Sequence, residues 1–274
     1  MVKWLHVIAT GTSILRNFEF TFRDRARELS IEGWFRLPPS DPRQDEAWKV
    51  VRAGSDSETY RALRDYLRGN PRAASAELNA FLRYVSLSNH APPKDVGVLV
   101  YSTDTGTGYL CAALIHEYLM EEGYATLTPE PVRVEGLGTS EESLDDGLAN
   151  LLDKVVSVIK EKVSEGVRVY INATAGFKPE TTFLTLAAAI AGATATYYIH
   201  EAFKEVIELP LPPLTIDPKI KQLIRKVGPE GTDVTEYEET ARNLGLNPQE
   251  LLERKLLTLK DKVKPRKWLT LITG

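Results

Sequence analysis

The segment Asn172-Ala-Thr-Ala-Gly-Phe-Lys-Pro-Glu180 contains the residue types that bind an anion. Its small residues leave backbone N–H groups accessible, and Lys178 adds a full positive charge. Pro179 suits the first turn of a helix, where an N–H has no partner within the helix. Because amides at a helix N-terminus attract phosphate, we predict a phosphate-handling site here. The expected ligand contacts are Asn172, Thr174, Ala175, Gly176 and Phe177, together with Lys178.

Two other turns share this small, hydroxyl-rich character. Residues 11–13 follow an apolar stretch that ends at Thr10, and residues 102–108 follow a second such stretch. Asp104 is the only acid within the three turns, although Glu180 follows closely, so the turns supply hydroxyls and amides rather than a carboxylate pair. A purely structural role as tight turns is the alternative. As a functional site, the two turns are expected to contact ligand through Thr10, Gly11, Thr12, Ser102, Thr103, Asp104, Thr105 and Gly106.

The familiar phosphate and metal motifs are absent from the sequence. None of the turns is a Walker A loop or a GxGxxG fingerprint, which disfavours a nucleoside triphosphatase or a dinucleotide enzyme. The four histidines, His6, His90, His116 and His200, are scattered, and neither HxxxH nor CxxC spacing occurs. We therefore expect no metal and no cofactor, and structural roles for His6 and His200.

The turns would be positioned by alternating strands and helices. Apolar and β-branched stretches predict strands over residues 3–10, 96–102, 128–134, 167–172, 193–199 and 205–209, and periodic patterns predict helices over 109–122, 141–164 and 180–191. This alternation predicts an α/β fold with a Rossmann-like, mostly parallel sheet. Ligands bind beyond the carboxyl ends of such strands, so we expect the three turns to converge at one edge of the sheet.

Two regions depart from this alternation. Residues 30–93 are mostly helical and polar, with periodic helices over 57–67 and 73–85, and are predicted to be an insertion. A proline-rich linker at 209–214 precedes a tail with helix patterns over 218–227, 236–244 and 248–255 and a β-hairpin pattern formed by 256–260 and 267–272. We predict a Rossmann-like domain over residues 1–210 and a small winged helix-turn-helix-like domain over 215–274.

Composition limits the class of protein further. The chain has 274 residues, with 43% hydrophobic residues, a net charge of −4 and one cysteine, Cys111, so a disulfide framework is excluded. The N-terminus does not have the pattern of a signal peptide, and no apolar run is long enough to span a membrane. We expect a cytoplasmic protein without a membrane partner.

The residues 11–13 after the first strand and the segment 172–180 resemble the CRISPR-associated Rossmann-fold (CARF) proteins, and more narrowly the CRISPR ring nuclease 1 family. The resemblance covers roughly residues 1–210, with the helical insertion only loosely matched. It implies a homodimer that binds cyclic tetra-adenylate, the second messenger of type III CRISPR antiviral defence, across its two-fold axis. It also implies metal-independent cleavage of this ring to linear di-adenylate with a 2′,3′-cyclic phosphate, which ends the signal. The catalytic serine and lysine of the family fall on Ser13 and Lys178.

The residues agree with that chemistry. A ribose 2′-OH can attack the neighbouring phosphorus, so the protein need only hold the geometry and stabilise the developing charge. Lys178 suits the second role, and Ser13 can orient the 2′-OH or a phosphate oxygen. The absence of a dedicated base within the turns predicts slow turnover. Backbone amides that could cradle phosphates are those of Gly11, Thr12, Ala175 and Gly176.

Two other functions are compatible with such a pocket. A non-catalytic sensor would bind the cyclic oligoadenylate and use the winged-helix tail to bind DNA, as a transcriptional regulator. The tail helices carry acids beside their bases, so DNA binding is weakly supported. An effector ribonuclease would use an Arg-x(4–6)-His pattern, which Arg83 and His90 match, but the tail is too short for the helical domain that this pattern requires.

Overall fold

The computed structural model describes residues 2–137, 143–175, 178–199 and 205–273. A seven-stranded sheet forms its centre, in the order β3-β2-β1-β5-β6-β7, with β4 also pairing with β2. All the strand pairs are parallel except β6 with β7. The predicted α/β fold with a mostly parallel sheet is therefore confirmed. The strands are β1 (Trp4–Thr10), β2 (Val96–Thr103), β3 (Ala125–Thr126), β4 (Val132–Val134), β5 (Arg168–Asn172), β6 (Ala195–Ile199) and β7 (Val206–Pro210).

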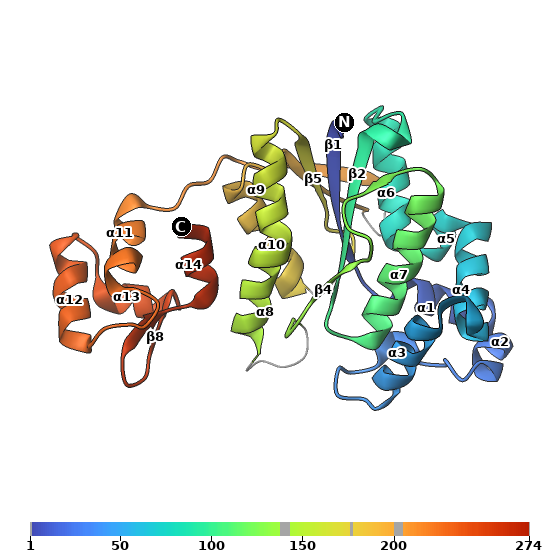
Figure 1. The fold of residues 1–274 in the computed structure, drawn as a ribbon, viewed down its shortest axis with the longest axis horizontal. Coiled ribbons are helices and arrows are strands. Elements are labelled where there is room, and N and C mark those ends of the chain that lie inside the picture. The colour runs from blue at the N-terminus through green and yellow to red at the C-terminus, as the bar shows by residue number, and fades with distance from the viewer. Residues whose placement is uncertain (1, 138–142, 176–177, 200–204, 274) are drawn as a thin grey trace.

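Helices cover both faces of the sheet (Figure 1). On one side lie α6 (Ala76–Leu87) and α7 (Gly106–Glu121), and on the other lie α8 (Leu144–Leu151), α9 (Ser157–Ser164) and α10 (Lys178–Ile190). The central strand β1 is buried on both faces, because Leu5 and Val7 pack in one hydrophobic cluster while Ile8 packs in the other. Alternate side chains of a strand point to opposite faces, so a strand buried on both sides is mostly apolar; the two polar residues of β1, His6 and Thr10, are also buried.

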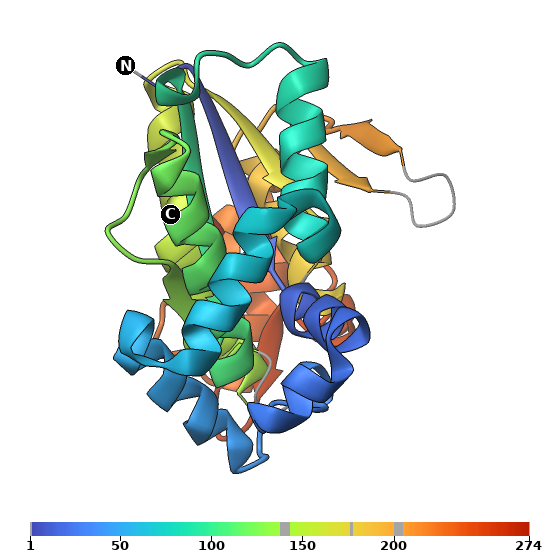
Figure 2. The ribbon, with the colours of Figure 1, turned by 90° about the vertical axis from the view of Figure 1, so that its right-hand side faces the viewer.

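Residues 30–93, predicted to be a helical insertion, are mostly helical and pack beside α7 (Figure 2). The predicted helix over 73–85 is divided at Ser75, whose hydroxyl caps α6 by accepting a hydrogen bond from the Leu78 N–H at 3.1 Å. The insertion and the segment before it contain α1 (Ser13–Thr21), α2 (Arg23–Glu28), α3 (Arg43–Ala53), α4 (Glu58–Gly69) and α5 (Pro71–Ala74), besides α6.

The strand predicted over 128–134 is wrong in extent, because the segment contains only the short β4 and the preceding β3 lies upstream of it. The helix predicted over 141–164 contains a π-helical turn, Leu152–Val156, between α8 and α9. The turn and the residue before it contribute four side chains to the hydrophobic cluster on this face of the sheet, namely Leu151, Leu152, Val155 and Val156.

The tail begins with the three predicted helices, α11 (Pro218–Val227), α12 (Val234–Asn243) and α13 (Pro248–Glu253). The predicted hairpin is wrong in its second strand: β8 (Leu257–Leu259) pairs with β9 (Val263–Pro265), and residues 267–273 form helix α14. A helix places Leu269 and Ile272 on one face, and both are buried.

Helix α14 packs against the main body of the protein. Trp268 contacts Phe183 of α10, with ring centroids 5.3 Å apart, and Lys267 Nζ donates to Asp146 of α8 at 2.5 Å. Arg266 forms an ion pair with Asp145. None of the helices in the described ranges is long and apolar enough to cross a membrane.

Candidate functional site

The three predicted turns lie at one edge of the sheet, as expected. In the strand register Thr10 is opposite Ser102, and Ile8 is opposite Asn172, so β1, β2 and β5 end within about three residues of one another at the same edge. The turns border a pocket of about 630 Å³. They contribute Thr10, Gly11, Thr12, Ser13, Thr103, Thr105, Thr107, Gly108, Thr174 and Ala175, and neighbouring segments contribute Arg16, Phe35, Leu37, Pro39 and Ala76.

Ser13, the predicted catalytic serine, is hydrogen-bonded to a carboxylate that the sequence analysis did not identify. Its hydroxyl donates to Glu77 Oε2 at 2.5 Å and accepts the N–H of Ala76 at 3.1 Å. Glu77 lies in the first turn of α6 and is fully buried. The serine proton is therefore directed toward the carboxylate, and the remaining acceptor capacity of the oxygen can face the pocket.

Glu77 connects several parts of the site. Its Oε1 accepts the N–H of Gly11 at 2.8 Å, and its Oε2 accepts the hydroxyl of Ser75 at 2.7 Å. Its backbone carbonyl accepts the side-chain amide of Asn172 at 2.9 Å. The Gly11 amide, which was expected to cradle a phosphate, is thus bonded to Glu77 instead.

Sequence reasoning missed Glu77 because it belongs to the insertion and not to a strand-end turn. One signal could have revealed it. Glu77, Phe81 and Tyr84 follow the i, i+4, i+7 spacing of a buried helix face, and all three are buried. An acid on an apolar stripe needs partners inside the fold, and so marks a polar site.

The second turn is shorter than predicted, because α7 begins at Gly106 rather than at residue 109. Thr105 caps the helix through the Gly108 N–H at 3.2 Å. The N–H of Thr107 is bonded by the side chain of Gln44, whose Oε1 accepts it at 3.0 Å. The N-terminus of α7 is thus partly satisfied by α3.

Several predicted contacts of this turn point elsewhere. The Asp104 carboxylate accepts from Arg133 Nε at 2.5 Å and from the Gly136 N–H at 3.1 Å. Ser102 is buried and donates to the Thr103 carbonyl. A Cβ on Gly106 would lie 2.2 Å from the Gln44 carbonyl oxygen, so Gly106 serves close packing of α7 on α3.

The third turn is partly described. Asn172 is buried, and its Oδ1 accepts the N–H of Thr174 at 3.2 Å. Thr174 and Ala175 border the pocket, whereas Gly176 and Phe177 lie outside the described residues. Lys178 is the first residue of α10, and its side chain lies outside the described part.

Glu180 is not part of this pocket. It is fully buried in the first turn of α10. Burial, and next the charge of Glu180, raise the pKa of Tyr101 well above its usual value. The acid therefore faces the core below the sheet edge.

Arg16 is a cation that the sequence analysis did not include in the site. Its exposed side chain borders the pocket and has no ion-pair partner among the described residues. It follows Ser13 by three positions on α1, a spacing that places both residues on one helix face. The spacing from the candidate serine was the signal that could have identified it.

The histidines are engaged in other ways. His6 Nδ1 lies 3.0 Å from the Tyr197 hydroxyl, and His6 Nε2 lies 3.1 Å from His90 Nδ1. Burial holds the pKa of His6 well below its usual value and lowers that of His90 to about 4. Arg83 is exposed and bonded to Asn79, so Arg83 and His90 have separate partners.

His116 Nε2 lies 3.0 Å from the Thr128 carbonyl, and His200 lies outside the described residues. Within the described ranges, the structure contains no group of three His, Cys, Asp or Glu side chains that could hold a metal ion.

A sequence model of the family described as CRISPR-associated protein (Cas_APE2256) matches residues 72–212, just over half of the chain. The matched segment includes Glu77, the turn after β2 and the turn after β5. Ser13 and Arg16 precede it.

Proposed function

Because the chain belongs to the CRISPR-associated Cas_APE2256 family, we propose that it is a metal-independent ring nuclease acting on cyclic tetra-adenylate. It would bind the ring across a homodimer and cleave it to linear di-adenylate with a 2′,3′-cyclic phosphate, switching off type III CRISPR signalling. The observation that carries the proposal is the Ser13–Glu77 hydrogen bond at the edge of a hydroxyl-lined pocket.

The proposed reaction requires a proton acceptor for the attacking hydroxyl. The ribose 2′-oxygen forms a bond to the adjacent phosphorus, the bond from phosphorus to the 5′-oxygen breaks, and the 5′-oxygen leaves with a proton taken from water. Since the Ser13 proton already points at Glu77, Ser13 can accept the 2′-OH proton while its own moves to the carboxylate. General-base catalysis of this kind contributes roughly 10²–10⁴-fold.

Charge on the phosphorus oxygens would be stabilised by Lys178, at the start of α10. We predict that Lys178→Ala loses far more cleavage than binding, because the lysine is assigned to the transition state. Arg16→Ala is the matched comparison: an exposed cation at the pocket border is expected to weaken binding and cleavage together. Equal loss of binding and cleavage in Lys178→Ala would mean that the lysine only binds the ligand and does not stabilise the transition state.

The decisive experiment incubates the purified protein with cyclic tri-, tetra- and hexa-adenylate in excess EDTA and identifies the products by mass. The proposal expects a di-adenylate cyclic phosphate from the tetra-adenylate ring. Tight binding without product over hours would contradict it and favour the non-catalytic sensor. Product only after addition of a divalent cation would refute the metal-independent mechanism.

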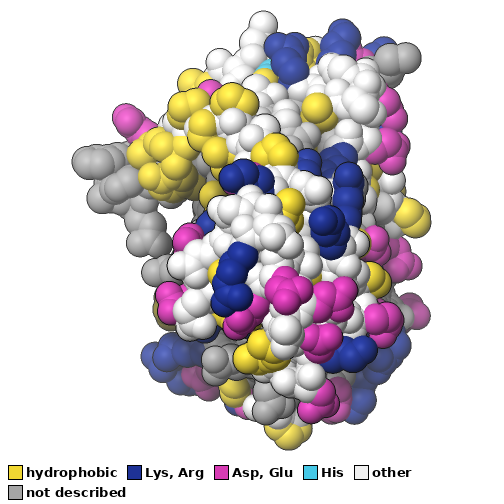
Figure 3. All heavy atoms as spheres, turned by 90° about the vertical axis from the view of Figure 1, so that its left-hand side faces the viewer, with side chains coloured by type: hydrophobic (Ala, Val, Ile, Leu, Met, Phe, Trp, Pro, Cys, Tyr) yellow, Lys and Arg dark blue, Asp and Glu magenta, His cyan; other side chains and the backbone are white. Residues whose placement is uncertain are grey.

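The order of helices and strands in the tail, residues 215–274, bears on whether it binds DNA. Three helices followed by a short hairpin support a winged-helix-like domain over residues 215–274. On the face viewed from the tail side, lysines and arginines are interspersed with acids (Figure 3). Because DNA-binding surfaces concentrate positive charge, this mixture favours a role in supporting the fold or the dimer over DNA binding.

A further inference from the structure

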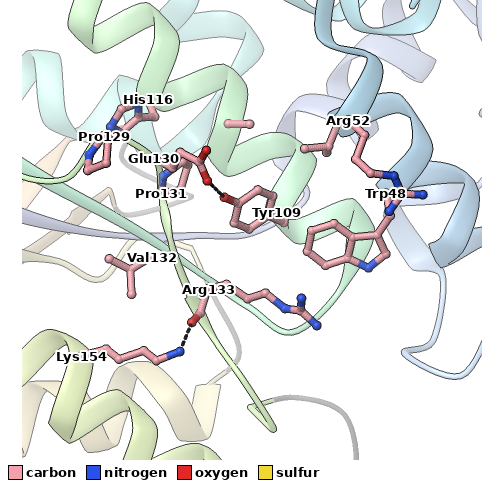
Figure 4. A pocket seen from close by; sticks show the side chains of 12 residues that line it. Trp48, Arg52, Tyr109, His116, Pro129, Glu130, Pro131, Val132, Arg133 and Lys154 are labelled. Carbon is pink, nitrogen blue, oxygen red and sulfur yellow. Dashed lines mark hydrogen bonds between the residues drawn. The ribbon is translucent and has the colours of Figure 1, made fainter.

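A second pocket, of about 730 Å³, lies between α3, α7 and the segment around β4 (Figure 4). Its volume is within the roughly 300–1,000 Å³ range of small-ligand sites. It is separate from the pocket of Ser13, with which it shares no lining residue. Nothing in the proposed ring cleavage uses it.

Aromatic side chains form one part of this pocket. The rings of Trp48 and Tyr109 have centroids 5.0 Å apart with an angle of 36° between their planes. The guanidinium of Arg133 lies 4.7 Å from the centroid of the Trp48 ring. Neither Trp48 nor Tyr109 is fully buried, so the pocket offers a partly exposed stacking platform.

Cations lie on both sides of the rings. Figure 4 places Arg52 beside Trp48 and Lys154 at the opposite end, with Arg133 between them. Arg52 is exposed and has no ion-pair partner in the described part of the chain. Lys154 Nζ donates to the Arg133 carbonyl at 3.1 Å and lies 3.7 Å from Glu135, so its positive charge is only partly offset.

Polar acceptors complete the pocket. The Glu130 carboxylate accepts the Tyr109 hydroxyl at 3.4 Å, and both residues border the cavity. A carboxylate in such a position can accept hydrogen bonds from the exocyclic amino group of a base. Three cations and one acid, Glu130, therefore line the pocket. Two of the cations have acidic partners outside the lining, and Arg52 is the one without an ion-pair partner among the described residues.

We propose that this second pocket binds a nucleoside phosphate. The base would stack on the Trp48–Tyr109 platform, and the phosphate would be held by Arg52 with Arg133 or Lys154. Arginine suits this role because its planar donors match phosphate oxygens. A simple anion has no base to stack on the rings, and an uncharged nucleoside has no phosphate for the cations. We therefore expect a ligand that carries both groups to bind more tightly than either.

The second pocket also meets the first through the end of β2. Arg133 is ion-paired with Asp104, and the residues on either side of Asp104, Thr103 and Thr105, border the pocket of Ser13. A phosphate that bonds Arg133 competes with Asp104 for the same guanidinium. The two pockets therefore share one wall, although they are lined by different side chains.

The test titrates adenosine 5′-monophosphate into the full chain while tryptophan fluorescence is recorded, with adenosine and inorganic phosphate as separate titrants. Saturable quenching by the monophosphate, and weaker binding of the other two, is expected. Trp48→Leu should remove the quenching. Arg52→Ala should weaken binding about tenfold, which is about 1.4 kcal/mol, because the phosphate loses a charge-assisted hydrogen bond.

Arg225→Ala removes an exposed arginine of α11 that borders neither pocket, so it is the matched control and should keep the affinity of the wild type. Because the Arg52 side chain is exposed, Arg52→Ala should fold normally. Its affinity therefore tests the proposal even if Trp48→Leu lowers stability. Unchanged affinity in Arg52→Ala would overturn the proposal. Loss of affinity in Arg16→Ala alone would also overturn it, by locating the nucleotide in the pocket of Ser13. Neither result bears on whether the first pocket cleaves a ring.

Discussion

Glu77 is buried, has no counter-cation among the described residues, and is stabilised by donors from several segments. It accepts the Gly11 amide and the hydroxyls of Ser13 and Ser75. Hydrogen bonds to a charged acceptor are about twice as strong as neutral ones, which is how a carboxylate can stay inside the fold. Its orientation therefore fixes the orientation of the Ser13 hydroxyl at the pocket.

The Glu77→Gln substitution tests this arrangement. If the amide NH₂ faces the Gly11 N–H, that hydrogen bond is lost; if it faces the hydroxyls of Ser13 and Ser75, it donates to them instead of accepting, so the Ser13 proton has no carboxylate to move to. We expect cleavage of cyclic tetra-adenylate to fall by about 10²-fold or more, with a loss of roughly 1–3 kcal/mol in the free energy of unfolding. Single-turnover cleavage and urea unfolding measure the two effects.

Glu19→Gln is the control for that prediction. Glu19 is also a buried acid that accepts a backbone N–H, from Gly33 at 2.6 Å, but it does not border the pocket. It should lose stability and keep cleavage. If the two variants cleave equally, Glu77 is a structural residue only.

At the scale of single residues, the sequence predicted the turn residues of the pocket but not the helix residues that bond to them. Ser13 and the residues of three turns could be predicted because they follow strands, and parallel strands end at a common edge. Glu77 and Gln44 could not be placed, because they reach the turns from helices distant in sequence. Their contacts depend on how the insertion packs on α7, which hydrophobic periodicity does not specify.

The contact between α3 and α7 decides the geometry of the second turn. Gly106 lies against the Gln44 carbonyl, with Ala47 Cβ 3.1 Å from the position of an added Cβ. Gln44 in turn bonds the Thr107 N–H. Separation of the two helices would displace both Thr107 and Gly108 at the pocket.

Gly106→Ala should therefore destabilise the protein, by about 1–3 kcal/mol, because the methyl group overlaps a backbone atom that cannot rotate away. Gly69→Ala is the matched control, since a Cβ added to this last residue of α4 would have no other atom within 4 Å. That change is expected to be neutral or mildly stabilising. Equal urea midpoints for the two variants would refute the close-packing role of Gly106.

Elements with strong periodicity were predicted well, and those determined by tertiary contacts were not. The strands β1 and β2 are mostly apolar runs of seven and eight residues, and the shorter β5 has an apolar middle, so composition specifies all three. Residues 267–272 alternate too weakly to distinguish a strand from a helix. They form α14 because its apolar side packs on α8 and α10, where Trp268 meets Phe183.

The stability of the whole molecule is expected to depend on pH through the His6–His90 pair. The folded-state pKa of His90 is about 4, against 6.5 for the unfolded chain, and that of His6 is also depressed. Between these values the unfolded chain binds protons that the folded chain does not. Stability is thus complete above about pH 6.5 and falls as the pH is lowered toward 4.

The slope would be up to about 1.4 kcal/mol per pH unit for each histidine. Arg168 lowers the pKa of His90 after burial, and Glu208 opposes it. Urea unfolding at pH 7.5 and pH 5.0 measures the effect, and His90→Gln should flatten the dependence. Identical urea midpoints for the wild type at the two pH values would contradict it.

The pairing of β1 has a consequence for synthesis of the chain. β1 emerges first, but its neighbours β2 and β5 lie far downstream, with Trp4 paired to Val96 and Arg168. At roughly 5–20 residues per second, a ribosome adds the residues from the end of β1 to the end of β5 in about 8–32 s. Contacts of such long sequence separation also slow folding. β1, which leads to Ser13, can pair with β2 once residue 103 has been added but lacks its other neighbour until residue 172, so a nascent chain that ends before residue 172 should expose it to chaperones.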